Sequence, residues 1–248
     1  EILSGLVGSE MCIRDRGRRL QKLGGGRCPV RMRNKPWAAP ELNACPFFVR
    51  QPQKQIGAWH SLFPRKQPLH LELGCGKGFF LAGAAPLNPQ INYLGIDLKD
   101  AVLAPAKRNI EKSFEQAGRP VDNVILTALD IERLLTAMDS ADTVERIYIL
   151  FCNPWSKPRH HKRRLTHPRQ LESYKKILAP GGEIEFRTDD DGLFRDTLGY
   201  LRESGFEVVR TTYDLHAEHP EGNIMTEHEL MFSEKGVPIK ALTARRKE

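Results

Sequence analysis

The chain has 248 residues, of which 40% are hydrophobic and 28% are charged, and its formal net charge of +7 corresponds to a pI of about 9.2. This length fits one large domain, and no run approaches the roughly 18 apolar residues that a membrane-spanning helix needs. The positive charge favours polyanionic partners. The five cysteines form no C-x-x-C pair and are odd in number, which argues against a disulfide framework and favours the reducing cytoplasm.

Residues 1–29 have no sustained helical or strand period and contain three consecutive glycines at 24–26. Their basic cluster is not followed by an apolar segment, so we do not expect a secretory signal. Residues 6–16 resemble a translated sequencing-adaptor tract. We therefore expect residues 1–29 to be a non-native or disordered extension, with the native start at Val30 or Met32. Residues 30–248 are expected to form a single domain.

From residue 69 onward, short apolar runs alternate with longer windows of helical period. We expect strands at residues 69–73, 93–96, 124–129, 147–151, 183–188 and 206–210. Helices are expected at residues 79–85, 101–117, 131–138, 169–178 and 193–204. One helix between successive strands predicts an α/β fold, Rossmann-like and doubly wound, with a mainly parallel sheet. The apolar runs at 230–232 and 238–244 are expected to add an antiparallel C-terminal edge.

Three glycines, Gly74, Gly76 and Gly78, follow the first expected strand at alternate positions. Glycine lets the backbone turn tightly and approach a ligand without a Cβ clash. The spacing is G-x-G-x-G, and position 79 is Phe where the dinucleotide fingerprint has its third glycine. The loop therefore disfavours NAD and suits a methyl-donor nucleoside without a pyrophosphate.

Acidic residues accompany this loop at the ends of the first three expected strands. Asp97 ends the second strand, where a carboxylate can accept the two hydroxyl groups of a ribose, and Asp130 ends the third, near an adenine. Glu72 immediately precedes the loop and either orients it or binds the amino-acid portion of the ligand. Because open α/β sheets bind ligands at the carboxyl ends of their strands, this constellation predicts S-adenosylmethionine as the cofactor.

The fourth expected strand runs into Asn153-Pro154-Trp155, where a transferase would present its acceptor base. Residues 156–169 follow, with six Lys or Arg, three His and no acidic residue. A run of one sign is typical of a phosphate-binding loop, because a solvated face normally mixes charges. The histidines lack accompanying cysteines or a helical i, i+4 pair, so we expect no metal. Trp155 or Phe151 could stack on the base, and the tail at residues 245–247 could hold phosphates.

Over residues 31–247 the sequence resembles the bacterial tRNA (guanine-N7-)-methyltransferase family. The resemblance rests on the motifs Arg33-Asn34-Lys35-Pro36-Trp37, the glycine loop, Asn153-Pro154-Trp155 with residues 157–166, Phe186-Arg187-Thr188-Asp189 and Thr226-Glu227-His228-Glu229. It implies a class I S-adenosylmethionine-dependent methyltransferase with tRNA as its partner. The implied reaction is methylation of guanine N7, at position 46 of the tRNA variable loop, without a general base.

The resemblance also implies roles for individual residues. Those of the donor site would be Glu72, Asp97, Asp130 and Asn153, and those of the acceptor site Lys157, Asp189, Thr226, Glu227, His228 and Glu229. The glycine loop itself adds Gly74, Gly76 and Gly78 to the expected donor site, and the basic loop adds Arg159, Arg163 and Arg164 to the expected substrate-binding residues. The family usually has Asp before the Pro-Trp pair, and that Asp is often assigned the catalytic role. Asn153 keeps a carbonyl acceptor but lacks the charge, and our hypothesis is that Asp189 shares the catalytic role with it.

Two other functions stay open on the sequence alone. Asn153-Pro154-Trp155 also resembles, less closely, the Asn-Pro-Pro-aromatic motif of enzymes that methylate exocyclic amines such as adenine N6. A noncatalytic RNA-binding protein could keep the same core, but it would have no need of the acidic strand ends. A small-molecule methyltransferase would have no use for the basic loop. The sequence does not distinguish a monomer from a homodimer.

Overall fold

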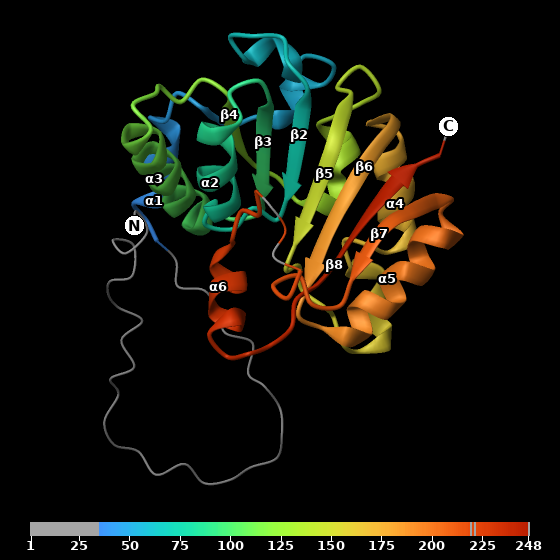
Figure 1. Ribbon diagram of the computed structural model, residues 1–248. Helices are drawn as coiled ribbons and strands as arrows, with labels where there is room; N and C mark the ends of the chain where they lie inside the picture. Colours follow the sequence, from blue (N-terminus) through green and yellow to red (C-terminus); the bar gives the residue numbers. More distant parts are fainter. Residues whose placement is uncertain (1–34, 219, 221, 248) are drawn as a thin grey trace, which may run out of the picture. The chain divides into compact units, whose positions relative to one another are not determined.

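The computed structural model describes residues 35–218, 220 and 222–247, so the expectation for residues 1–29 lies outside the described part of the chain. Its eight strands form one sheet in the order β1-β4-β3-β2-β5-β6-β8-β7 (Figure 1). The strands are β1 Phe48–Val49, β2 Leu69–Leu73, β3 Asn92–Asp97, β4 Val124–Ala128, β5 Val144–Leu150, β6 Leu178–Thr188, β7 Phe206–Thr212 and β8 Lys240–Arg246. The pairs from β1 to β6 are parallel, and β8 runs antiparallel to both β6 and β7.

Helices cover both faces of this sheet (Figure 1). They are α1 Ala38–Asn43, α2 Phe79–Leu87, α3 Asp100–Gln116, α4 Pro168–Lys175, α5 Asp191–Glu203 and α6 Glu227–Ser233, with 3-10 segments η1 Pro52–Gln55, η2 Trp59–Leu62, η3 Ile131–Thr136 and η4 Pro158–Arg163. One apolar cluster joins α1, α2 and α3 to the sheet, and a second joins α4 and α5 to it. The fold is therefore the expected α/β class with a mainly parallel sheet.

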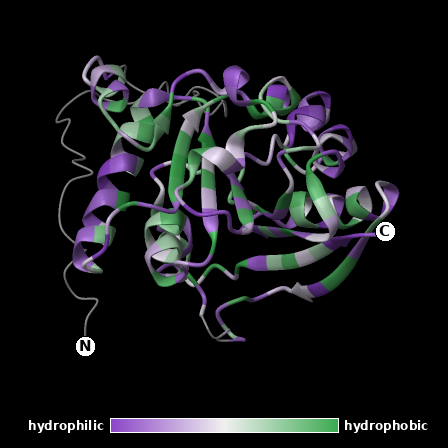
Figure 2. Cartoon of the chain, turned by 90° about the horizontal axis from the view of Figure 1, so that it is seen from above, coloured by the Kyte–Doolittle hydropathy of each residue, from purple (hydrophilic) through white to green (hydrophobic). Residues whose placement is uncertain are grey.

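The central strands are hydrophobic because both of their faces are covered. All five residues of β2 are buried, and green, hydrophobic stretches run along strands between the helices in Figure 2. Helix α3, by contrast, is covered on one side only and is amphipathic. Its buried side carries Leu103, Ala104, Ile110 and Phe114, and its other side is polar. This pattern explains why apolar runs and helical periods located most of the expected elements.

Three expected elements differ in the structure. Residues 131–136 form the 3-10 helix η3 rather than an α-helix, and Arg133 inside it has non-helical dihedral angles. The apolar residues 230–232 lie in α6 rather than in a strand, because Thr226 and Glu229 form a capping box that starts a helix. Strand β8 is antiparallel as expected, but it is inserted between β6 and β7, so β7 forms the edge.

The strand order reverses between β2 and β5, which places a topological switch point at their carboxyl ends. Helix α6 and the segment after β5 lie at this edge of the sheet (Figure 1). Because β8 runs the other way, its last residues lie at the opposite edge, where Arg245 pairs with Glu183 at 2.9 Å. The tail and the basic loop therefore lie at opposite ends of the sheet, and the expectation that both hold phosphates stays a prediction. No helix in the described residues is long and apolar enough to cross a membrane.

Candidate active site

The glycine loop after β2 adopts backbone conformations that favour glycine. Gly74, Gly76 and Gly78 have φ angles of 83°, 53° and 68°. A Cβ on Gly76 would meet no heavy atom within 4 Å, so the loop borders open space there. A Cβ on Gly78 would lie 2.9 Å from the Cβ of Ala106, so this glycine allows α3 to pack closely against the loop. The first two glycines thus face the space for a ligand, and the third sets the helix packing.

The carboxylate of Asp97, at the end of β3, is hydrogen-bonded to the glycine loop. Its Oδ2 accepts the Gly76 N–H at 3.0 Å, and its Oδ1 accepts the Lys99 N–H at 3.3 Å. Burial raises the pKa of Asp97, and the backbone N–H groups of Gly76 and Lys99 partly oppose this effect. Asp130 lies beyond the end of β4, is exposed, and caps η3 by accepting the Glu132 N–H at 3.0 Å.

Glu72 is the most unusual ionisable group near the loop. It is 4% exposed, and its Oε2 is buried without a hydrogen-bond partner. Burial and then the nearby Asp97 raise the pKa of Glu72 to about 8, while Arg187 acts in the opposite direction. A buried polar oxygen without a partner has a desolvation cost, which a hydrogen-bond donor on a ligand could remove. Glu72 is therefore a candidate ligand-binding residue.

We expect the ligand-free protein to lose stability as the pH rises from 5 to 8 because of Glu72. Between its ordinary pKa of 4.5 and the raised value of about 8, the folded state binds more protons than the unfolded state, so the free energy of unfolding falls with pH. Thermal unfolding at several pH values measures this slope, which should flatten in Glu72→Gln. The exposed Glu115→Gln on α3 should keep the wild-type slope; parallel slopes for all three proteins would contradict the assignment.

One cavity brings the expected donor and acceptor residues together. Its lining includes Glu72, Gly74 and Gly76 from one side and Thr226, Glu227 and His228 from the other. The Nζ of Lys77 in the loop lies 2.6 Å from Oε1 of Glu227, which ties the start of α6 to the glycine loop. Phe151 at the end of β5 also lines the cavity and stacks on His228, with 5.7 Å between ring centroids.

Other expected site residues lie nearby but not in this cavity: Asp97, Asp130, Asn153 and Asp189 are absent from its lining. Asp189 directly follows β6, and its backbone carbonyl accepts Nζ of Lys240 at 3.1 Å. Asp189 and the cavity therefore lie at the same edge of the sheet, where the parallel strands end, although the Asp189 carboxylate does not line the cavity.

The turn after β5 is strained at two positions. Phe151 and Trp155 have φ angles of 54° and 44°, and they are the non-glycine residues with positive φ in the described part of the chain. Such a conformation costs about 1–3 kcal/mol per residue and is concentrated at functional sites. Asn153 lies between them, is exposed, and accepts the Trp155 N–H at 3.0 Å through its side-chain oxygen. This hydrogen bond holds the turn and occupies the oxygen that Asn153 keeps in place of a carboxylate.

The basic segment after this turn presents most of its cations to solvent. Lys157, Arg159, Lys162 and Arg163 are exposed, and in the residues that the structure describes none of them pairs with a carboxylate. The guanidinium of Arg163 lies 5.2 Å from the centroid of the Trp155 ring. These side chains form an uncompensated positive surface beside the candidate cavity.

Arg164 differs from its neighbours. It is 3% exposed, its Nη1 lies 2.5 Å from Oδ2 of Asp196 on α5, and its Nε donates to the Pro154 carbonyl at 2.8 Å. Its Nη2 also contacts Nε2 of His161 at 3.0 Å. In this structure Arg164 therefore anchors the basic segment, with each of its three side-chain nitrogens bonded to another protein group.

Replacing Arg164 should test this anchoring role. We expect Arg164→Gln to lower the free energy of unfolding by about 1–3 kcal/mol, because it leaves Asp196 and the Pro154 carbonyl without their buried partner. The matched control is Arg163→Gln on the exposed surface, which should change stability by less than about 0.5 kcal/mol. Chemical denaturation compares the two variants. Equal stabilities would show that Arg164 is not an anchor.

The segment from Thr226 to Glu229 is divided between the cavity and the interior. Thr226, Glu227 and His228 line the cavity, whereas Glu229 is fully buried and pairs with Arg187 at 3.0 Å. The sequence did not indicate this role of Arg187. A signal was present in the alternation of charged and apolar residues along β6, which predicts one polar face of the strand. Lys77 was also missed, because its partner Glu227 is distant in the sequence.

Comparison with known proteins shows the family to which this chain belongs. A family model described as "Putative methyltransferase" matches residues 66–242. The tRNA (guanine-N(7)-)-methyltransferase of Clostridium beijerinckii is 55% identical over 215 residues, which cover 87% of this chain and 98% of that protein. The enzyme of the same name from Clostridium perfringens is 53% identical over 218 residues, which cover 88% of this chain and all of that protein. The chain belongs to the tRNA (guanine-N(7)-)-methyltransferase family.

Solved structures agree with this membership at the level of the fold. The 16S rRNA methyltransferase KamB superposes with a TM-score of 0.54 and 14% identity over 80% of this chain and 92% of its own. An antibiotic-related methyltransferase superposes with the same TM-score, 16% identity and coverage of 75% and 89%. The sheet is therefore that of the class I methyltransferases.

The methyl donor of this family is S-adenosylmethionine, and the residues present fit it. The orphaned Oε2 of Glu72 and the space over Gly76 offer a hydrogen-bond acceptor and room for a close approach. Asp97 lies at the strand end where a ribose is bound in related sheets. Within the described residues no group of three or more His, Cys, Asp or Glu side chains is arranged to hold a metal ion.

Proposed function

We propose that this protein transfers the methyl group of S-adenosylmethionine to N7 of guanine 46 in the variable loop of tRNA. The observation that carries the proposal is the cavity that joins the glycine loop to Thr226, Glu227 and His228. It lies at the switch point of the sheet, beside an exposed basic segment and in a chain of this family.

In this proposal, the donor is held by the residues below and beside the glycine loop. Glu72, Asp97 and the backbone of Gly74 and Gly76 would bind it, and Asp130 would meet its adenine. When bound, S-adenosylmethionine supplies an electrophilic methyl group on a sulfonium. Asp97 already orients the loop through the Gly76 N–H, so part of the site is formed in advance.

For this reaction the protein has to align the two substrates, and it does not have to transfer a proton. Guanine N7 has a free lone pair at neutral pH, so no general base is needed. Holding the lone pair in line with the methyl group is worth up to about 7–11 kcal/mol. Positive charge spreads onto the purine during transfer, and carboxylates or carbonyl dipoles near the ring stabilise it. We assign this electrostatic role to Asp189 and to the dipole of Asn153.

The tRNA would be held mainly through its phosphates. Lys157, Arg159, Lys162 and Arg163 form an exposed positive surface without carboxylate partners in the described residues. Arg164, which the basic run of the sequence predicted to bind the substrate, acts in this proposal by positioning the surface. Phosphate contacts of this kind make binding depend on salt concentration. Because tRNA is the substrate, we also propose that the protein acts in the cytoplasm.

Transcripts of one tRNA test the position of the methyl group. A transcript with guanine at position 46 should accept label from S-adenosylmethionine, and the same transcript with adenine there should not. Digestion to nucleosides then distinguishes 7-methylguanosine from an N6-methylated adenosine. Label in the adenine-containing transcript would contradict the proposed position, and N6-methyladenosine would favour the amine-methylating alternative.

A further inference from the structure

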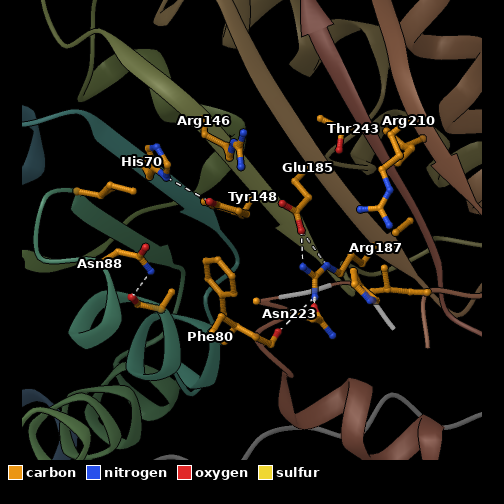
Figure 3. A pocket seen from close by; sticks show the side chains of 18 of the residues that line it. His70, Phe80, Asn88, Arg146, Tyr148, Glu185, Arg187, Arg210, Asn223 and Thr243 are labelled. Atoms are coloured by element: carbon orange, nitrogen blue, oxygen red, sulfur yellow. Dashed lines mark hydrogen bonds and ion pairs between the residues drawn. The ribbon is translucent and has the colours of Figure 1, made fainter. Parts of the chain in front are cut away.

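The side chain of Arg187 on β6 makes five hydrogen bonds, which link its strand to residues 223–229. Its side chain is 8% exposed and lies on the sheet face that Figure 3 shows, at the edge of a cavity of about 300 Å³. The Nε of Arg187 donates to Oε1 of Glu185 at 2.9 Å, and its Nη2 also binds Glu185. This neighbour on the same strand fixes the plane of the guanidinium and leaves Nη1 directed at another segment.

The segment that Nη1 reaches is the one that carries the expected acceptor residues. Nη1 donates to Oδ1 of Asn223 at 2.7 Å, to the Ile224 carbonyl at 3.2 Å and to Oε2 of Glu229 at 3.0 Å. Nδ2 of Asn223 donates to the other oxygen of Glu229 at 2.9 Å. Arg187, Asn223 and Glu229 therefore form a closed triangle of hydrogen bonds.

This triangle determines where the start of α6 lies. The carboxylate of the fully buried Glu229 accepts the backbone N–H of Thr226, and the backbone N–H of Glu229 donates to the Thr226 hydroxyl. Because Glu229 also binds Arg187, this capping box is attached to Arg187. The next residue, Glu227, reaches Lys77 of the glycine loop at 2.6 Å. A continuous set of bonds thus runs from β6 to the loop expected to hold the methyl donor.

We propose that Arg187 and Asn223 are positioning residues, which act through Glu229 to fix Thr226, Glu227 and His228 over the donor site. The inference rests on the proposed function and deepens it. In this proposal, Glu229 faces the interior and touches neither tRNA nor S-adenosylmethionine. Both of its oxygens are occupied by Arg187, Asn223 and the Thr226 N–H. The triangle sets the distance between the acceptor base and the methyl group.

Substituting Arg187 itself would leave the fully buried Glu229 and the partly buried Glu185 without their cationic partner and could unfold the chain. The test therefore uses Asn223→Ala, which keeps the Arg187–Glu229 ion pair, and Glu229→Gln, which keeps the shape of the Glu229 side chain. The double variant combines the two. The matched control is Glu234→Gln, an exposed carboxylate just after α6. Kinetics with unmodified tRNA are measured where melting curves show each protein to be folded.

We expect both single variants to lower kcat by about 10- to 100-fold, because a small displacement of the reacting groups has an effect of this size. KM for tRNA and Kd for S-adenosylmethionine should change less than about threefold, since phosphates and the glycine loop supply most of the binding. The double variant should be no worse than the poorer single variant, because both act on one triangle. Glu234→Gln should match the wild type.

Two results would overturn the inference. One is a wild-type kcat in Asn223→Ala. The other is a double variant whose loss equals the product of the single losses, which would give Glu229 its own contact with the acceptor. A wild-type protein that forms no 7-methylguanosine would instead refute the proposed function, so the two failures are distinguishable.

Discussion

Asp189→Asn is expected to lower kcat about 100-fold while leaving KM for tRNA and the affinity for S-adenosylmethionine nearly unchanged. Positive charge develops on the purine only during transfer, so a carboxylate near the ring stabilises the transition state more than the bound substrates. The variant keeps the size of the side chain and removes its charge. Steady-state kinetics with unmodified tRNA measure both constants.

Two further variants make this result specific. Asp191→Asn removes a neighbouring exposed carboxylate that pairs with Lys240 at 2.9 Å, and it should keep wild-type kcat. Asn153→Asp restores the residue that the family usually has before Pro-Trp, and it should restore part of the rate when combined with Asp189→Asn. Near-normal kcat in Asp189→Asn would end the hypothesis that this carboxylate shares the catalytic role.

Reversing the exposed charges of the basic segment should produce an equally large effect on binding. We expect the triple variant Arg159→Glu, Lys162→Glu, Arg163→Glu to bind tRNA about 10²- to 10³-fold more weakly. These cations have no carboxylate partner in the described residues, so their charge is available to phosphates. The plot of log affinity against log salt concentration should also become shallower by about 2–3. Filter binding at several salt concentrations measures both quantities.

The matched control changes the net charge by the same amount elsewhere. The exposed Lys54 in η1, Lys66 before β2 and Lys112 in α3 lie outside the basic segment, and their replacement by Glu should weaken binding only slightly. An equal loss in both triple variants would mean that net charge, and not the basic segment, governs the affinity. Binding of S-adenosylmethionine should be unaffected in both.

The sequence predicted the fold well because its signals are local. The apolar runs marked strands that are buried on both faces, and the glycines at 74, 76 and 78 marked a turn that requires positive φ. Since the carboxyl ends of parallel strands meet at one edge, the strand pattern alone was enough to place Glu72 and Asp97 near one another. Helix α6 was missed because three apolar residues outweighed the capping-box pattern Thr226-x-x-Glu229, which was visible.

The site was harder to predict where it depends on partners far along the chain. Arg163 and Arg164 are identical in type, yet one is exposed and the other is buried against Asp196, which is 32 residues away. The contacts of Arg187 with Asn223 and Glu229 span 36 and 42 residues. No period or motif encodes such pairs, since they exist only after β6, α5 and α6 have been packed together.

The most direct test of the account is methyl transfer from labelled S-adenosylmethionine to bulk tRNA that lacks this modification, followed by nucleoside analysis. The account predicts that the wild-type chain, with Asn153 in place of the usual aspartate, forms labelled 7-methylguanosine. Label in another nucleoside, or no label although the donor binds, would contradict it.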